Sequence, residues 1–262
     1  MNFQKISAEL NGIILSAGDY IIAQRKGFYL DKVEVKSMNQ LVSYVDINAE
    51  KMLVEQLTNL LPEAGFITEE NTTDKGQKDY NWIIDPLDGT TNFIHDMPVY
   101  SVSVALAKGE EILVGAIYEL GRKELFTAWK NGGAWLNGQS IHVSSERNLS
   151  QSLLATGFPF YDFEYMEAYI SVLKQLLRST HGLRRMGSAA VDMAYVACGR
   201  FEGFFEYGLH AWDIAAGILL VKEAGGQVVD FKGGEDYLFG KTIISGNTEI
   251  HKDLLKLIKS EF

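Results

Sequence analysis

The chain has 262 residues, of which 47% are hydrophobic and 22% charged, so it is typical of a globular protein with one large domain or two closely packed halves. Its formal net charge of -10 argues against a nucleic-acid backbone as the main partner, because such binding depends on Lys and Arg. The only cysteine is Cys198, which excludes an internal disulfide and indicates a reducing compartment. The N-terminal residues lack the apolar core of a signal peptide, and the apolar run "IAAGILLV" is far shorter than the roughly 20 residues that cross a bilayer. We therefore expect a cytoplasmic chain that does not associate with membranes.

The first part of the chain begins with helical patterns and continues with strands. Apolar side chains at helical spacing from Phe3 to Ile22 predict a helix over about 3–26. A second helix is predicted from about Asp46, which is placed to cap it, to Leu61. Short β-like runs follow, with Gly and Asn breaks, and they predict an antiparallel meander: "NWIID", "YSVSVALA", "ILVGAIYEL" and "KELFTAW".

After about residue 150 the pattern alternates between strand and helix. Strands are predicted at "SLLATGF", "FEGFFEY", "GQVVDF" and "TIISGN", and helices over 163–178, 188–199, 211–224 and 248–259. An antiparallel part followed by an alternating part predicts stacked helix and sheet layers. Because no linker rich in Pro, Gly or Ser separates them, we expect residues 1–262 to form a single domain, with the two parts, about 1–150 and 151–262, as its halves.

The stretch "WIIDPLDGTTNF" carries an apolar run into a turn that holds Asp85 and Asp88. Asp-Pro and Asp-Gly are strong turn formers, so a well-made turn is one interpretation. The other is that the turn directs two carboxylates and a hydroxyl at one point, as sites for hard cations require. Two further acidic residues lie next to apolar runs. Glu69 in "FITEEN" follows a short apolar run, and Asp213 in "LHAWDIAAG" starts a longer one. Taken alone, Glu69 is a solvated loop charge and Asp213 a helix N-cap.

Two segments of the chain resemble the paired signatures of the inositol monophosphatase family of magnesium-dependent, lithium-sensitive phosphatases. These segments are "WIIDPLDGTTNF" and "WDIAAGILLVKEAGG", and the likeness extends through "GAWLNGQ", "ATGFPF" and "IISGN" over nearly the whole chain. The resemblance implies an α/β fold, the layered αβαβα sandwich of the inositol monophosphatase and fructose bisphosphatase type. It also implies a homodimer.

The same resemblance implies a metal centre and a substrate site. Two to three Mg²⁺ ions are expected, with ligands from Glu69, Asp85, the Leu87 carbonyl, Asp88 and Asp213. The implied catalytic residues are Glu69 and Thr90, which orient the attacking water, and Asp46, which helps to activate it. The implied substrate contacts are Asp88, Asp213, the phosphate-binding amides of Gly89 and Thr90, and Ala189 and Glu206 on the polyol side. Physically, clustered carboxylates raise one another's pKa, and bound cations reverse this local field so that an acidic site accepts a phosphate.

The function implied is hydrolysis of a phosphate monoester by metal-activated water, with myo-inositol 1-phosphate as the leading substrate. The alternatives within the superfamily are fructose 1,6-bisphosphate, histidinol phosphate and a 3′-phosphorylated nucleotide. An alternative of another class is a regulatory binding protein without turnover, against which the intact pair of Glu69 and Thr90 argues. The sequence leaves Arg184 and Arg185 open between a phosphate contact and a partner subunit, and it favours structural roles for His95, His210 and Cys198.

Overall fold

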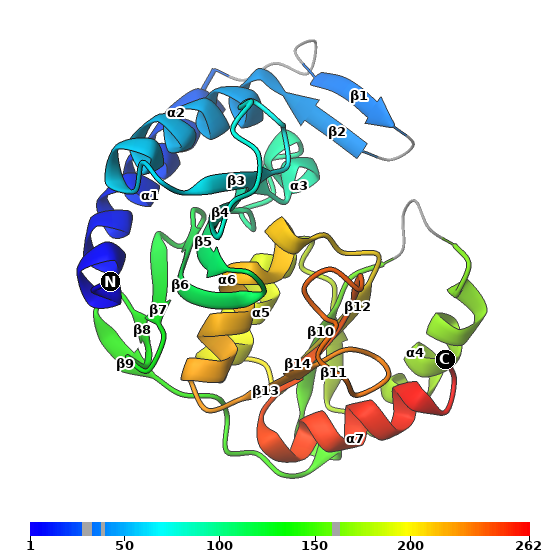
Figure 1. Ribbon diagram of the computed structural model, residues 1–262. Coiled ribbons are helices and arrows are strands. Elements are labelled where there is room, and N and C mark those ends of the chain that lie inside the picture. Colours follow the sequence, from blue (N-terminus) through cyan, green and yellow to red (C-terminus); the bar gives the residue numbers. More distant parts are fainter. Residues whose placement is uncertain (28–32, 38–39, 159–162) are drawn as a thin grey trace.

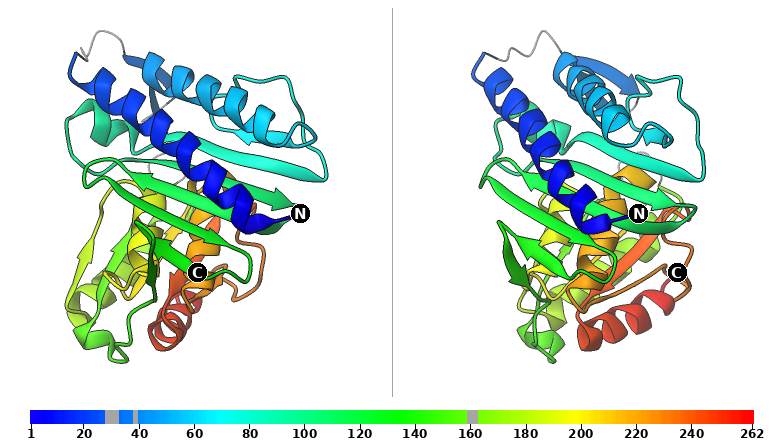
Figure 2. Two further views of the ribbon diagram at one scale, coloured as in Figure 1. Left: turned by 90° about the vertical axis from the view of Figure 1, so that its left-hand side faces the viewer. Right: turned by 60° about the vertical axis from the view of Figure 1, so that its left-hand side comes forward.

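The computed structural model describes residues 1–27, 33–37, 40–158 and 163–262. Its helices and sheets alternate in layers (Figure 1). Helices α1 (Phe3–Arg25) and α2 (Tyr44–Leu60) cover the outer face of a seven-stranded sheet, and Figure 2 shows them side by side on it. Helices α5 (Ala189–Ala197) and α6 (Ala211–Glu223) lie between this sheet and a five-stranded sheet, whose far face carries α4 (Met166–Ser179) and α7 (Thr248–Lys259). The predicted αβαβα order is confirmed.

The seven-stranded sheet has the order β3-β4-β5-β6-β7-β8-β9. From β4 onward all neighbours are antiparallel, as the meander predicts, whereas β3 pairs with β4 in parallel, which the sequence patterns do not indicate. The register places Thr68 at the end of β3 opposite Ile84. The strands are β3 (Gly65–Thr68), β4 (Tyr80–Asp88), β5 (Ser101–Lys108), β6 (Glu111–Glu119), β7 (Glu124–Trp129), β8 (Ala134–Leu136) and β9 (Gln139–Ile141).

The five-stranded sheet is mixed, with the order β11-β10-β12-β14-β13. Strand β10 runs parallel to both of its neighbours, and the remaining pairs are antiparallel. The strands are β10 (Leu153–Thr156), β11 (Gly182–Arg184), β12 (Gly203–Tyr207), β13 (Gln227–Val229) and β14 (Thr242–Gly246). A small hairpin, β1 (Val33–Ser37) with β2 (Gln40–Ser43), the short helix α3 (Thr90–Ile94) and a 3₁₀ turn, η2 (Leu149–Gln151), complete the described elements.

Three apolar cores hold these layers together. The outer core packs α1 and α2 on the large sheet around Trp82, the central core packs α5 and α6 between the sheets, and the third packs α4 and α7 on the small sheet. All residues of α5 are buried, which explains why its sequence is apolar nearly all round. Gly115 on β6 permits the close approach of α6, because a Cβ there would lie 3.1 Å from the Ala216 backbone.

The structure corrects the start of several predicted helices. Helix α2 begins at Tyr44 and is capped by Ser43, so Asp46 is not its N-cap but the third helical residue, whose side chain completes a capping box. Asp213 likewise occupies the third position of α6, which His210 caps. Helix α4 begins at Met166 rather than residue 163, and part of the matched "ATGFPF" segment lies outside the described residues. In the described part of the chain, no helix is long and apolar enough to span a bilayer.

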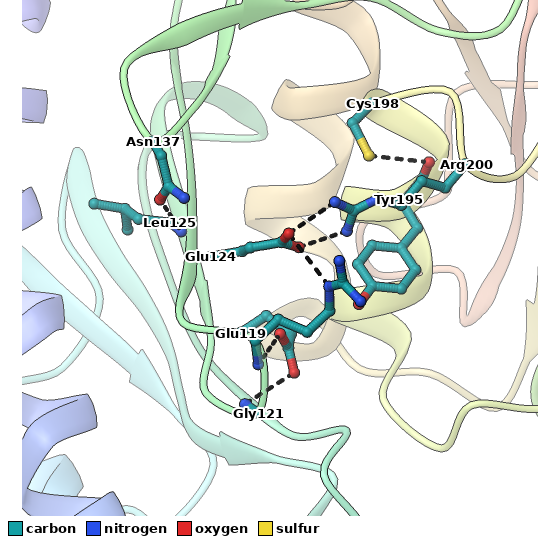
Figure 3. Close-up of polar contacts among 9 residues, drawn as sticks. Glu119, Gly121, Glu124, Leu125, Asn137, Tyr195, Cys198 and Arg200 are labelled. Atoms are coloured by element: carbon teal, nitrogen blue, oxygen red, sulfur yellow. Dashed lines mark hydrogen bonds and ion pairs between the residues drawn. The ribbon is translucent and has the colours of Figure 1, made fainter.

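An ion pair ties the large sheet to the layer behind it (Figure 3). Arg200, which follows α5, donates to both carboxylate oxygens of Glu124 on β7, at 2.5 and 2.8 Å. The guanidinium carbon also lies 4.7 Å from the centre of the Tyr195 ring. These contacts with Arg200 lower the pKa of Glu124, the direction expected when hydrogen bonds favour the charged form of an acid.

Candidate active site

The end of strand β4 carries Asp85 and Asp88 into a tight turn. A register shift lies between them where β4 pairs with β5, and Asp85 Oδ1 accepts a hydrogen bond of 2.9 Å from the Leu87 amide. Gly89 follows with φ of +94°, a conformation that glycine adopts without a steric penalty. The predicted turn therefore exists, and it starts α3 with Thr90.

Asp88 connects the large sheet to the central helix layer. Its Oδ2 accepts hydrogen bonds from the Ser188 hydroxyl at 2.6 Å and the Ala190 amide at 2.7 Å, at the N-terminus of α5. Burial raises the pKa of Asp88 to about 6, and these hydrogen bonds oppose the rise. The Asp88 carboxylate thus joins β4, in the first half of the chain, to α5, in the second half.

Glu69 reaches the same edge because β3 pairs in parallel with β4. Its amide extends the pairing by donating to the Ile84 carbonyl at 3.3 Å, which places Glu69 beside Asp85. Burial raises the pKa of Asp85 well above its usual range, and the charges of Glu69, Asp88 and Asp213 raise it further. The four predicted carboxylates are therefore electrostatic neighbours. Across the described ranges, however, no three acidic, His or Cys side chains form a ready-made metal-ligand cluster.

Asp46 and Thr90 meet although 44 positions separate them in sequence. The Thr90 hydroxyl lies 3.0 Å from Asp46 Oδ1 and 3.0 Å from the Leu87 carbonyl, so its one hydrogen is shared between two acceptors. Asp46 Oδ2 accepts from the Ser43 amide at 2.9 Å and the Ser43 hydroxyl at 2.6 Å. Burial still raises the pKa of Asp46, with the hydrogen bonds from Ser43 and Thr90 acting against it.

Asp213 approaches from the start of α6. Its Oδ2 accepts a hydrogen bond of 2.6 Å from the His210 amide, which fixes the carboxylate at the helix N-terminus. Burial raises the pKa of Asp213 well above the ordinary value, and Asp88 is the largest of the neighbouring charges that add to this. The N-terminus of a helix favours a negative charge, so α6 stabilises the ionised form in part.

The opposite edge of the site comes from the second half of the chain. Ala189 is the first residue of α5 and is almost fully buried, and Glu206 on β12 is 7% exposed. Gly157 makes room for Glu206, because a Cβ at position 157 would overlap its carboxylate. Burial raises the pKa of Glu206 to about 8, while the positive charge of Arg185 lowers it.

Comparison with known proteins shows the family to which this chain belongs. The sequence pattern of the inositol monophosphatase family matches residues 5–261. The chain belongs to this family. It is 44% identical over 234 residues to the Nus factor SuhB of Escherichia coli K12, with 88% of each chain covered. It is 40% identical over 229 residues to the inositol-1-monophosphatase of Mesorhizobium japonicum, covering 87% of this chain and 86% of the relative.

Solved structures of inositol monophosphatase family relatives share the whole fold. The extragenic suppressor protein SuhB of Bartonella henselae superposes with a TM-score of 0.91 at 37% identity, covering 97% of this chain and 98% of that one. The inositol monophosphatase of Anabaena superposes with a TM-score of 0.88 at 32% identity, covering 100% and 98%. The fold predicted from the family signatures is therefore confirmed over the full length.

The structure adds polar residues that the family signatures did not single out. Ser43 holds Asp46, Ser188 holds Asp88, and Asp192 on α5 is a fully buried acid whose Oδ1 has no hydrogen-bond partner in the described residues. Ser43 could have been found from the spacing Ser-x-x-Asp, which resembles a capping box. Asp192 gave no signal, because one acidic residue in an apolar helix does not show which neighbours surround it.

The side chains with open or structural interpretations also have defined surroundings. The Arg185 guanidinium carbon lies 5.8 Å from the Phe158 ring centre, and its charge lowers the pKa of Asp88. Arg184 is exposed and donates to the neighbouring Leu183 carbonyl at 2.9 Å. Three residues have structural contacts: His210 stacks on Trp212, Cys198 lies against the Tyr195 carbonyl, and His95 ends α3.

Proposed function

We propose that this chain is a magnesium-dependent phosphate monoester hydrolase that acts on myo-inositol 1-phosphate. The family is one of phosphatases, and one relative that covers most of the chain is named inositol-1-monophosphatase. The observation that carries the proposal is that Asp85 is buried beside Glu69, Asp88 and Asp213, whose charges all act to raise its pKa. So much buried negative charge in one place is unfavourable unless a cation is bound.

The donor set fits Mg²⁺ by its chemistry. Hard cations prefer carboxylate and carbonyl oxygens, and the proposed ligands are Glu69, Asp85, the Leu87 carbonyl, Asp88 and Asp213. Two to three ions bound there would supply the positive charge that activates a water and stabilises the transferring phosphoryl group. Inhibition by Li⁺ follows from the family resemblance and is part of the proposal.

The chain's own residues would bind the substrate and orient the reactants. The Thr90 hydroxyl is directed at Asp46 and the Leu87 carbonyl, so its lone pairs are available to accept a hydrogen bond from a water that Glu69 also orients. The amides of Gly89 and Thr90 would hold the phosphate. Ala189 and Glu206 would contact the polyol, with the Glu206 carboxylate accepting hydrogen bonds from its hydroxyls.

A panel of phosphate esters assayed for released phosphate tests this proposal. We expect turnover of myo-inositol 1-phosphate with Mg²⁺, its loss in excess chelator, its recovery on adding Mg²⁺ back, and inhibition by Li⁺. Fructose 1,6-bisphosphate, histidinol phosphate and a 3′-phosphorylated nucleotide serve as competing substrates. Full turnover by metal-free protein would contradict the metal mechanism, and preference for another ester would replace the substrate.

A second candidate function is favoured by the names of the relatives. Several relatives of 42 to 44% identity are named Nus factor SuhB, so a role as a Nus factor is a candidate for this chain, with or without catalysis. Replacing the Escherichia coli relative by this chain and by its Asp85→Asn variant separates the two. Equal complementation by both forms would support a role independent of hydrolysis, whereas complementation by the unaltered form alone would link the role to catalysis. The proposed homodimer and cytoplasmic location are testable by light scattering and cell fractionation.

A further inference from the structure

Glu50 is a buried acid that the proposed reaction does not use. It lies on α2 one turn after Asp46, and it is 0% exposed. Both of its oxygens accept backbone hydrogen bonds: Oε2 from the Glu70 amide and Oε1 from the Thr72 amide, each at 2.8 Å. Burying a carboxylate is costly unless it is hydrogen-bonded, so these two donors explain how Glu50 is accommodated.

The segment that supplies these donors has a backbone suited to bind an anion. Asn71 lies between the two donors with φ of 52°, in the left-handed region that asparagine tolerates better than most residues. Turning the chain at this position lets the amides on either side point toward the same acceptor, as in the concavities of backbone amides that bind anions. Here the bound anion is the carboxylate of Glu50 from the same chain. The Asn71 side chain also donates to the Glu69 carbonyl at 3.3 Å.

This arrangement holds Glu69 from two directions. The Glu69 amide donates a hydrogen bond to the Ile84 carbonyl on β4. The amide of the next residue, Glu70, donates to the Glu50 carboxylate. We propose that Glu50 is a positioning residue for the metal centre, which fixes residues 70–72 and thereby keeps the Glu69 carboxylate beside Asp85; this inference rests on the proposed function. Helix α2 then serves the site twice, since successive turns place Asp46 against Thr90 and Glu50 behind Glu69.

The test compares Glu50→Gln with Glu55→Gln. Glu55 is an exposed residue of the same helix, so its variant makes the same change of charge without touching the segment 70–72. A Gln at position 50 keeps one acceptor oxygen but presents an NH₂ group to one of the two amide donors. We expect the Glu70 and Thr72 amides of metal-free Glu50→Gln to exchange with solvent about tenfold faster or more. We also expect calorimetry to show Mg²⁺ affinity about tenfold weaker, in the range found when partners of metal ligands are removed. Glu55→Gln should match the unaltered protein in both.

A lower melting temperature of Glu50→Gln with unchanged Mg²⁺ affinity would overturn the inference, because it would show a purely structural role. Unchanged amide exchange would also overturn it. If Glu50→Gln does not fold, Glu50→Asp takes its place, since it keeps the charge but withdraws the carboxylate by one methylene group. An unaltered protein that binds Mg²⁺ but hydrolyses no ester contradicts the proposed function alone. An unaffected variant of a Mg²⁺-binding protein contradicts this inference alone.

Discussion

The two edges of the site hold their acidic side chains in different ways. At the edge from the large sheet, Asp46, Asp85 and Asp88 each accept at least one hydrogen bond from the protein. At the opposite edge, burial and the charges of Arg185 and Asp88 determine the pKa of Glu206, with no hydrogen bond among the causes, and Asp192 Oδ1 is buried without a partner in the described residues. The first edge is therefore arranged before anything binds, as suits reaction chemistry. The second edge leaves Glu206 without such a constraint, which fits the proposed contact of Glu206 with hydroxyl groups of a ligand.

The largest effect is expected from Asp85→Asn at the fixed edge. Removing a proposed ligand charge should lower turnover about a thousandfold or more, because metal ions contribute several kcal/mol to such reactions. The pKa of Asp85 is raised by burial and by neighbouring carboxylates, so its ionised form destabilises the metal-free fold at neutral pH. The melting temperature in chelator should therefore hold or rise. Wild-type turnover at saturating Mg²⁺ would contradict the assignment of Asp85 as a ligand.

Glu206 should make the stability of the metal-free protein fall with rising pH. Its pKa is raised to about 8 from an ordinary value of 4.5, so its destabilising effect is absent below pH 4.5 and grows until the pH exceeds 8. The upper limit is on the order of a few kcal/mol. Glu206→Gln should flatten the decline in melting temperature between pH 5 and 9, measured by calorimetry in chelator. Glu55→Gln is the control, and a slope in Glu206→Gln equal to that of the unaltered protein would show that Glu206 titrates near its ordinary value.

The same variant should alter recognition more than chemistry. At pH above 8, Glu206→Gln should lower kcat/KM for myo-inositol 1-phosphate by about tenfold, or about 1.4 kcal/mol, because a hydroxyl loses its charged acceptor. Near pH 6 the loss should be smaller, since Gln resembles the neutral carboxyl group. A phosphate ester without hydroxyls on its leaving group should be hydrolysed as before. Equal losses on both esters would mean that Glu206 supports the metals or the fold.

The smallest effect is expected at the ion pair between Glu124 on β7 and Arg200 after α5, which joins the two halves of the chain. Glu124→Gln should lower the free energy of unfolding by about 1 kcal/mol at pH 7, because it weakens a hydrogen-bonded and partly exposed ion pair with Arg200. Arg200 holds the pKa of Glu124 below 4.5, so this stabilisation is present above pH 4.5 and is lost as the pH falls through the lowered pKa. Urea unfolding of the unaltered protein and of Glu124→Gln measures this difference in unfolding free energy at pH 7 and its loss at pH 3. A matching fall in kcat/KM would show that the joint also tunes the site.

The sequence predicts the layers well because their patterns are local. Helices α1 and α7 have the spacing of one buried face, and the strands β4 to β7 are apolar runs separated by turns. The parallel strand β3 was not predicted, because its direction depends on a pairing that its own few residues do not encode. The cap positions were wrong for Asp46 and Asp213, since an acid at the third helical position resembles one at the N-cap in sequence.

The site was predicted unevenly for a similar reason. Signature residues such as Asp88 could be named from the resemblance, and the structure shows that the Asp88 carboxylate accepts a hydrogen bond from the Ala190 amide at the start of α5. The contacts of Glu50 could not be predicted, because its partners are backbone amides 20 and 22 residues away, and backbone donors leave no mark in a sequence. The predicted pairing of Glu69 with Thr90 stays a prediction, while the pairing of Thr90 with Asp46 is a geometric finding.

Under the proposed function, Gly157 is a position from which the substrate range could be redesigned. Any Cβ at position 157 would overlap the Glu206 carboxylate, so the size of the residue at 157 controls the space available to Glu206. A larger residue at position 157 would displace the Glu206 carboxylate, and position 157 is not itself a proposed metal ligand. Libraries that vary residue 157 together with Glu206 would therefore search leaving groups while the phosphate chemistry stays constant. Under the proposed function, selectivity and reactivity would then be separately evolvable traits of one active site.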